Sequence, residues 1–204
     1  MDKEFRSADL SNAEIKEENN KLILEGYPIV FEQETLIGSE TRGFYEVIDK
    51  NAIDESALKD CCLKYNHENS SLILARVRNK SLQLTIDEHG VKMRAELQSD
   101  VTNHRDVYNL VKSHLLDKMS FAFVIQDYKL DRSGNLPKKR ITKINYIPEI
   151  SLVDTPAYEG TEVHARSIEM VEQEIATIEQ QESEKRNSEV ELEKLKAKVR
   201  LSLI

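Results

Sequence analysis

The sequence is poor in the residues that mark several common classes of protein. It has no tryptophan, four prolines and six glycines, and its only two cysteines, Cys61 and Cys62, are adjacent. Adjacent cysteines cannot form an ordinary disulfide without backbone strain, so we expect two reduced thiols. The five histidines and two cysteines show no recurring spacing of the kind that a metal site needs. We therefore expect neither a metal nor a cofactor.

Charge and hydropathy exclude two further classes. The formal net charge is −8, and the one compact basic run, residues 138–140 (Lys-Lys-Arg), is interpreted as a solvated hairpin face. Binding along a phosphate backbone needs clustered lysines and arginines, so no nucleic-acid partner is expected. No apolar run approaches the roughly 18–20 residues that span a bilayer, and the first residues lack the apolar segment of a secretory signal. These features predict a protein made in a cytoplasm, without a membrane segment.

The composition changes twice along the chain. Residues 1–20 are polar and charged, which is typical of a flexible segment. From Ser167 onward there is no glycine or proline, and Ile168, Val171 and Ile175 follow the spacing of a helix with coiled-coil tendency. A solvated helix without a partner is the alternative. The remaining length suffices for one domain with a substantial core. We therefore divide the chain into a flexible segment (1–20), a folded domain (21–166) and a helical, coiled-coil-like tail (167–204).

Within the middle segment, alternating apolar and polar residues predict strands. We expect them at residues 21–31 with a bulge at Gly26, 44–48, 72–77, 82–86, 91–97, 139–146 and 149–153. Apolar residues at helical spacing predict a helix between residues 100 and 117, with Val107, Val111 and His114 on its apolar face. A second, shorter helix is expected between residues 51 and 63. The pattern therefore favours a mixed α+β domain.

One further strand is expected at residues 118–125 (Lys-Met-Ser-Phe-Ala-Phe-Val-Ile), with a hydroxyl in its body. Alternation places Met119, Phe121 and Phe123 on one face and Ser120 and Ala122 on the other. A lone serine in a strand is usually a small packing residue. A chemical role for Ser120 must therefore be argued from other segments of the chain.

Five segments taken in order supply that argument. They are residues 26–31 (Gly-Tyr-Pro-Ile-Val-Phe), 43–48 (Gly-Phe-Tyr-Glu-Val-Ile), 66–67 (Asn-His), 119–123 (Met-Ser-Phe-Ala-Phe) and 149–153 (Glu-Ile-Ser-Leu-Val) followed by Pro156-Ala157. Together they resemble the prohead protease family of tailed phages, the capsid-maturation serine proteases related to the herpesvirus assemblins. The resemblance covers about residues 20–160. Each segment is weak alone, and their order makes the resemblance specific.

The resemblance implies a catalytic group of three side chains. A serine hydroxyl is a poor nucleophile at neutral pH and needs a nearby base, a role that suits histidine. The resemblance assigns Ser120 as nucleophile and His67 as base, with Glu149 as the carboxylate that orients the imidazole. The assemblin relatives use a second histidine in the third role, so His104 and His114 stay as alternatives to Glu149. A core histidine on the apolar face of its helix is the other interpretation of His114.

Two positions depart from the family's pattern. Family members usually follow the histidine with aspartate, where this chain has Glu68. They also frequently have a glycine directly before an arginine. This chain has Ala75 at that position, before Arg76. We therefore assign Arg76 no catalytic role.

The resemblance also implies a fold, an activity and partners. The expected fold is α+β, built on a small antiparallel, barrel-like sheet with packed helices as in assemblin. The expected activity is that of a serine endopeptidase that cleaves the major capsid protein, the scaffold and itself. It would act as a homodimer inside the procapsid, in the cytoplasm of a bacterial host that carries the phage or prophage. The alternative is a non-catalytic scaffolding or capsid-binding protein in which the helical tail carries the function.

Overall fold

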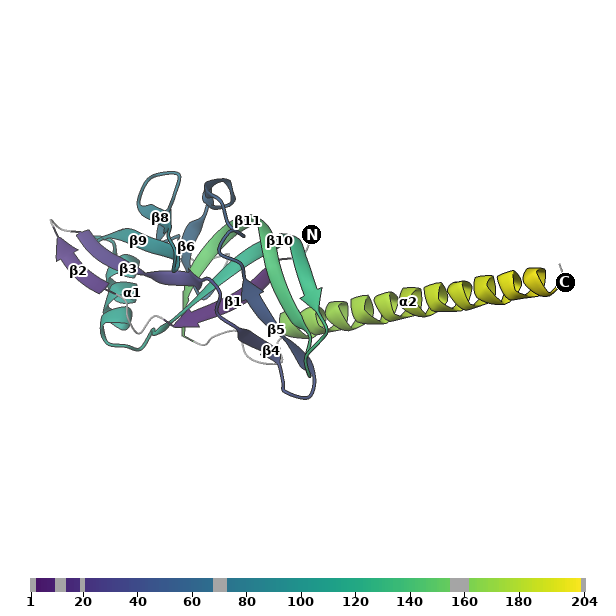
Figure 1. Cartoon of the computed structure of the whole chain (residues 1–204). Coiled ribbons are helices and arrows are strands. Elements are labelled where there is room, and N and C mark those ends of the chain that lie inside the picture. Colours follow the sequence, from purple (N-terminus) through teal and green to yellow (C-terminus); the bar gives the residue numbers. More distant parts are fainter. Residues whose placement is uncertain (1–2, 10–13, 19–20, 68–72, 155–161, 203–204) are drawn as a thin grey trace.

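Strands make up most of the body in this computed structural model, which describes residues 3–9, 14–18, 21–67, 73–154 and 162–202 (Figure 1). The described strands form two sheets. The larger sheet contains β1 (Glu4–Asp9), β10 (Lys118–Asp131), β11 (Lys138–Val153), β5 (Gly43–Ile48) and β4 (Thr35–Gly38) in that order, with β6 (Cys62–Tyr65) and β7 (Ala75–Arg76) attached through β11. The smaller sheet contains β2 (Glu14–Glu18), β3 (Lys21–Val30), β9 (Gly90–Gln98) and β8 (Leu82–Ile86).

The helices are peripheral to these sheets. A single 3₁₀ turn, η1 (Glu55–Leu58), follows β5, and α1 (Thr102–Lys112) contacts β3 and β9 of the smaller sheet. A long helix, α2 (Glu162–Ser202), closes the described chain. No helix within the described residues combines the length and apolar character needed to cross a membrane. The domain is therefore α+β, as expected, and its helices lie beside the two sheets.

The expected antiparallel, barrel-like sheet is only partly correct. Within the described residues the strands form two separate sheets and no closed barrel, and β11 pairs in parallel with both β5 and β6. Strand β5 lies beside residues 138–141 of β11, and β6 lies beside residues 149–152. Alternation in a sequence indicates which residues share a face, but it carries no information on strand direction. The parallel pairings were therefore not predictable from the pattern.

The β10–β11 hairpin forms the centre of the larger sheet. The expected faces of β10 are confirmed, because Met119, Phe121 and Phe123 lie in the main hydrophobic cluster together with Ile150 and Leu152 of β11. That cluster also includes residues of β3 and β9, so the core lies between the two sheets. The opposite face of the hairpin carries Ser120 and is buried too. A buried polar face is unusual and points to a specific role.

Several expected elements differ in length. The hairpin of β8 and β9 and the register shift after Gly26 in β3 are confirmed. Strand β11 runs unbroken from Lys138 to Val153, where two strands were expected. The helix expected as far as residue 117 ends at Lys112, and His114 follows it in a left-handed conformation with φ 57° and an exposed side chain. The interpretation of His114 as a core histidine is therefore wrong.

The N-terminal segment expected to be flexible contains β1 and β2. Strand β1 is anchored by Arg6, whose guanidinium donates to the buried carboxylate of Glu46 with an Nη2–Oε2 distance of 2.7 Å. Lys139, also buried, lies 3.9 Å from the same carboxylate. Burial disfavours the charged guanidinium, but Glu46 and Glu4 outweigh this effect and raise the pKa of Arg6. This buried ion pair therefore adds to the pairing of β1 with β10 in holding β1 to the body.

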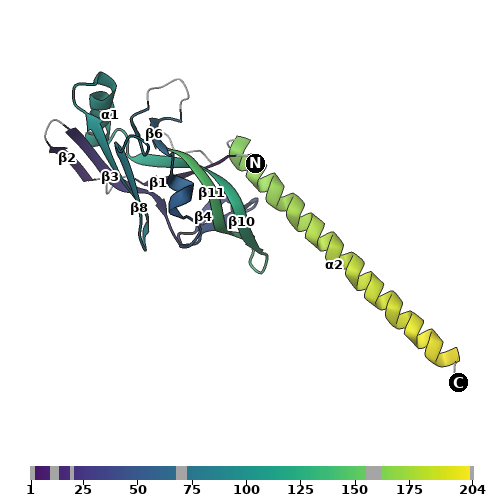
Figure 2. The same cartoon turned by 90° about the horizontal axis from the view of Figure 1, so that it is seen from above.

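The segment expected as a helical tail lies in α2 (Glu162–Ser202), and the first turns of this helix pack on the domain. Ile168, Val171 and Ile175 contact a small cluster formed by Ile37, Phe44 and Leu130. Beyond this contact the helix projects from the body as a long rod (Figure 2), and every described side chain from Gln181 to Lys196 is exposed. The first part of the apolar stripe is therefore used within the chain, and the coiled-coil assignment of the remainder stays a prediction.

We predict that Arg6→Met lowers the free energy of unfolding by about 3–5 kcal/mol, because Glu46 would remain buried without its main partner. The matched control is Arg42→Met. Arg42 also pairs with a glutamate, Glu172, but the two side chains are 64% and 49% exposed, and such surface pairs contribute at most about 1 kcal/mol. Urea unfolding followed by circular dichroism measures both. Equal losses in the two variants would contradict a special role of the buried pair.

Candidate active site

A row of polar residues crosses the larger sheet on the face opposite the core. Ser120 of β10 lies in register with Ser7 of β1 and with Ser151 of β11, and Ser151 lies in register with Lys64 of β6. Residues directly paired on neighbouring strands point to the same face of a sheet. The side chains of Ser120, Ser151 and Lys64 therefore share one face.

Glu149 occupies the adjacent row on this face. It is two residues before Ser151 on β11, and it lies in register with Ala122 of β10 and Cys62 of β6. Its side chain is only 7% exposed. The carboxylate therefore lies in a nearly buried position on the same face as the candidate nucleophile.

His67 reaches this face through a turn after β6. Asn66 and His67 both adopt left-handed backbone conformations, with φ of 48° and 55°. Asparagine tolerates this conformation better than most residues. The Asn66 amide N–H donates to the Leu152 carbonyl at 2.9 Å, and its side chain exchanges two hydrogen bonds with Asp154. These contacts fasten the turn to the end of β11, which places the imidazole beside Glu149.

The imidazole and the carboxylate form a direct hydrogen bond. The distance from His67 Nδ1 to Glu149 Oε1 is 2.7 Å. An ionised carboxylate only accepts hydrogen bonds, so Nδ1 carries the proton and Nε2 of a neutral ring is free to act as a base. The hydroxyl of Ser151 lies 3.2 Å from the same Nδ1 and can accept a weaker, shared bond. The geometry therefore fixes the tautomer that general-base catalysis needs.

The second oxygen of Glu149 has its own partner. Lys64 Nζ donates to Glu149 Oε2 at 2.5 Å, and the lysine side chain is 12% exposed. Burial raises the pKa of the Glu149 carboxyl, but the hydrogen bonds from His67 and Lys64 outweigh it, and the net effect is a pKa below the ordinary value of 4.5. Glu149 is therefore ionised at neutral pH in spite of its burial.

Ser120 and His67 share the face without a hydrogen bond between them. Ser120 Oγ and His67 Nε2 are both buried and have no hydrogen-bond partner among the described residues. The ring of Phe5, from β1, packs edge-on against the imidazole with 4.7 Å between ring centroids. Buried polar atoms without partners are rare because they cost free energy. The structure therefore brings Glu149 and His67 into contact and places Ser120, fully buried, on the same face.

The alternative histidines do not join this group. His104 lies on α1, where its Nδ1 accepts from the backbone N–H of Gln98 at 3.0 Å, and burial lowers its pKa. His114 lies exposed beyond the end of α1. Among the described residues, neither has a hydrogen bond or ring contact with His67 or Ser120. Of the three candidates, Glu149 is the one that is hydrogen-bonded to His67.

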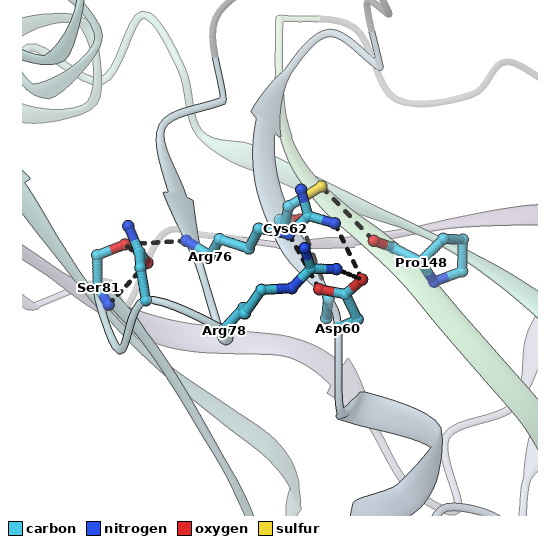
Figure 3. A network of polar contacts seen from close by, with 8 residues as sticks. Asp60, Cys62, Arg76, Arg78, Ser81 and Pro148 are labelled. Atoms are coloured by element: carbon cyan, nitrogen blue, oxygen red, sulfur yellow. Dashed lines mark hydrogen bonds and ion pairs between the residues drawn. The ribbon is translucent and has the colours of Figure 1, made fainter.

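Next to Glu149 lies a polar network centred on Asp60 (Figure 3). Its carboxylate accepts two hydrogen bonds of 3.0 Å from Arg76 and one of 2.5 Å from Arg78. Arg76 lies in register with Cys62, so it is two strands away from Glu149 on this face. Figure 3 shows both guanidinium groups converging on Asp60. Arg76 is therefore held by this carboxylate, in keeping with the lack of a catalytic assignment.

The two cysteines near the site are poor candidates for a nucleophile. Both are free and buried. Burial is the largest cause that raises the pKa of each thiol, and the Cys62 Sγ lies 3.6 Å from the Pro148 carbonyl oxygen, to which it donates. A thiol acts as a nucleophile only as the thiolate.

The sequence pattern did not identify Lys64, Ser151 and Phe5 as neighbours of His67 and Glu149. Alternation along residues 149–153 does place Ser151 on the same face as Glu149.

Glu149 should contribute stability that depends on pH. Its folded pKa lies below its ordinary value, so its ionised form stabilises the fold above about pH 4.5, and this contribution is lost as the pH falls through the folded pKa. We predict that the difference in free energy of unfolding between the unsubstituted chain and Glu149→Gln is largest near neutral pH and shrinks below about pH 4.5. Urea unfolding across this range measures it. A difference that grows on acidification would contradict the assignment.

Comparison with known proteins adds an independent observation. A family model described as caudovirus prohead serine protease matches residues 8–174. The matched segment includes His67, Ser120 and Glu149 and begins just after Phe5 and Arg6. No curated protein and no solved structure matches the chain.

Proposed function

The chain belongs to the family of caudovirus prohead serine proteases, and from this premise we propose that Ser120, His67 and Glu149 carry out its peptide-bond hydrolysis. A member of this family is a serine peptidase of phage capsid maturation. The observation that carries the assignment is the 2.7 Å hydrogen bond between His67 Nδ1 and Glu149 Oε1. It leaves Nε2 as an acceptor on the face where Ser120 lies.

In the proposed reaction, His67 Nε2 takes the proton of the Ser120 hydroxyl as Oγ attacks the scissile carbonyl carbon. The protonated imidazole then gives this proton to the leaving amine as the peptide bond breaks and an acyl-enzyme forms. Water, activated by the same nitrogen, hydrolyses the acyl-enzyme and restores Ser120. Glu149 remains ionised throughout, holds the ring through Nδ1–H and stabilises the imidazolium while it exists.

One rearrangement is needed before this reaction. Ser120 Oγ and His67 Nε2 have no mutual hydrogen bond here, and catalytic hydrogen bonds are often long or absent without substrate. Rotation of the Ser120 side chain among its staggered rotamers moves Oγ without moving the strand. Substrate must also reach Ser120, which is fully buried in this structure, and Phe5 on β1 packs against the imidazole. The isolated chain therefore corresponds to a resting form.

We propose the major capsid protein and the scaffold as substrates, and the chain itself as a third. The family's description, which refers to the prohead, supports capsid-assembly proteins as the substrate class and the interior of the procapsid, in the host cytoplasm, as the place of action. The exposed part of α2 supports a homodimer or a docking contact with the scaffold, because a helix that projects from the body offers its whole circumference to a partner.

A second candidate function is a non-catalytic scaffolding or capsid-binding protein. The observation that favours it is the same projecting helix, together with a site in which Ser120 and His67 are not hydrogen-bonded to each other. Labelling by a fluorophosphonate probe separates the two. Labelling that requires both Ser120 and His67 supports the peptidase, and its absence in folded protein, alone and co-assembled with capsid protein, supports the scaffold.

We predict that Ser120→Ala lowers cleavage of the co-expressed cognate capsid protein by about 10⁴-fold or more, because no other group can form the acyl-enzyme. Mass spectrometry of the termini of the capsid protein measures the cleavage. The matched control is Ser133→Ala, because Ser133 is an exposed serine in the turn between β10 and β11. This variant should cleave the capsid protein at the normal rate. Persistent cleavage by a folded Ser120→Ala chain would remove Ser120 from the role of nucleophile.

A further inference from the structure

We propose that Lys64 is a fourth member of the site, a positioning residue that holds the carboxylate of Glu149 so that its other oxygen faces His67. The proposal rests on the proposed function and deepens it, because it assigns a role to a residue that never touches the substrate. It is carried by the two hydrogen bonds that divide the Glu149 carboxylate between two donors.

The contacts assign one oxygen to each donor. Lys64 Nζ lies 2.5 Å from Glu149 Oε2, and His67 Nδ1 lies 2.7 Å from Oε1. The terminal torsion of a glutamate side chain is broad and is set by its partners rather than by intrinsic wells. If His67 moved and the carboxylate rotated with it, the hydrogen bond from Lys64 to Oε2 would lengthen. The lysine therefore limits the orientations in which Glu149 can meet the imidazole.

The chain places both donors on one short segment. Lys64 is in β6, whose parallel register with β11 puts it opposite Ser151 and one row away from Glu149. His67 follows three residues later, after the turn that Asn66 fastens to β11. Because one short segment carries both residues, the backbone fixes the positions of Lys64 and His67 relative to each other. The carboxylate is held between them from one side of the sheet.

Burial makes this positioning consequential. The side chains of Lys64, Glu149 and His67 are 12%, 7% and 23% exposed. Hydrogen bonds between charged groups are stronger where water is excluded. The lysine also opposes the effect of burial on Glu149, whose pKa it helps to lower.

Other titratable groups surround this pair and enter any pH dependence. They are Cys62, two residues before Lys64 on β6, Asp60 in the turn before β6, Arg76 on the neighbouring strand β7, and Tyr146 on β11. Asp60 and Arg76 are paired with each other, and burial is the largest cause that raises the pKa of both Cys62 and Tyr146. None of these groups changes charge near pH 6. A change in this range on substitution of Lys64 therefore reports on Glu149 and the imidazole.

A purely structural role for Lys64 would differ in its consequences. A lysine that merely compensates a buried carboxylate would affect stability when replaced, without altering how His67 is held. The test therefore needs readouts that stability does not move. The first is the downfield proton resonance of an imidazole N–H bound to a carboxylate, and the second is the pH profile of modification at Ser120.

The experiment compares Lys64→Met, which keeps the length of the stem and removes the donor, with Lys64→Arg, which keeps the charge and the donors. Lys64→Gln, a neutral donor, is a second variant if Lys64→Met does not fold. The proton resonance is recorded in a Ser120→Ala background, so that it does not depend on activity. We expect Lys64→Met to lose or shift this resonance and Lys64→Arg to retain it.

In the chain with Ser120 intact, we expect Lys64→Met to slow fluorophosphonate labelling about 10-fold or more and to change the pH profile of its rate. Lys64→Arg should stay within a few-fold of the unsubstituted rate. A Lys64→Met chain that keeps the resonance, or loses only stability while rate and pH profile are unchanged, overturns the proposal. If the unsubstituted chain is never labelled at Ser120, the proposed function fails, and the resonance alone decides whether Lys64 positions Glu149.

Discussion

The pairing of β11 with a strand on each side is the constraint on which the site depends. Through β10 it positions Ser120, through β6 it positions Lys64 and the turn to His67, and it carries Glu149 itself. A slip of one residue would exchange the two faces of a strand. It would turn Ile150 and Leu152, now buried in the core, onto the polar face. Hydrophobic packing on one side of β11 therefore enforces the chemistry on the other.

The site combines a well-ordered pair with an incomplete one. Glu149 and His67 are joined and supported, whereas Ser120 Oγ and His67 Nε2 are both buried and unsatisfied. In a stable core such atoms are a liability, and proteins retain them mainly where function requires them. A serine peptidase of capsid maturation must not hydrolyse the proteins of its host. Ser120, the proposed nucleophile, is fully buried here, and this burial is compatible with that requirement.

Sequence patterns predicted much of the fold where packing is local. The alternation in β3, β8, β9 and β10 identified their faces, and the helical spacing of Ile168, Val171 and Ile175 identified the stripe that packs on the domain. It could not reveal that Arg6 finds a buried carboxylate forty positions away. The pattern also predicted two strands in place of β11, with a break at Pro148, because proline lacks the N–H that a neighbouring strand would bind. Strand β11 continues through Pro148 because the proline lies at an irregularity of the pairing with β10, where the register shifts between Ala122 and Val124.

For the site, the order of five segments suggested Ser120, His67 and Glu149, and their catalytic roles remain proposals. The pattern could not identify Lys64, because a lysine in a strand is ordinarily a solvated residue. Its importance arises only when parallel pairing of β6 and β11 places it against Glu149. Local periodicity indicates which face of a strand a residue occupies. Contacts between strands far apart in sequence decide what it does.

The pairing of β1 with β10 has a consequence for the order of events during synthesis. Strand β1 is translated early, yet its neighbour in the sheet is made more than a hundred residues later. Contacts of such long sequence separation form late in folding. While the nascent chain emerges from the ribosome, Ser120, His67 and Glu149 have no common scaffold until β11 is complete. Partly translated chains therefore cannot hold these three side chains on one face.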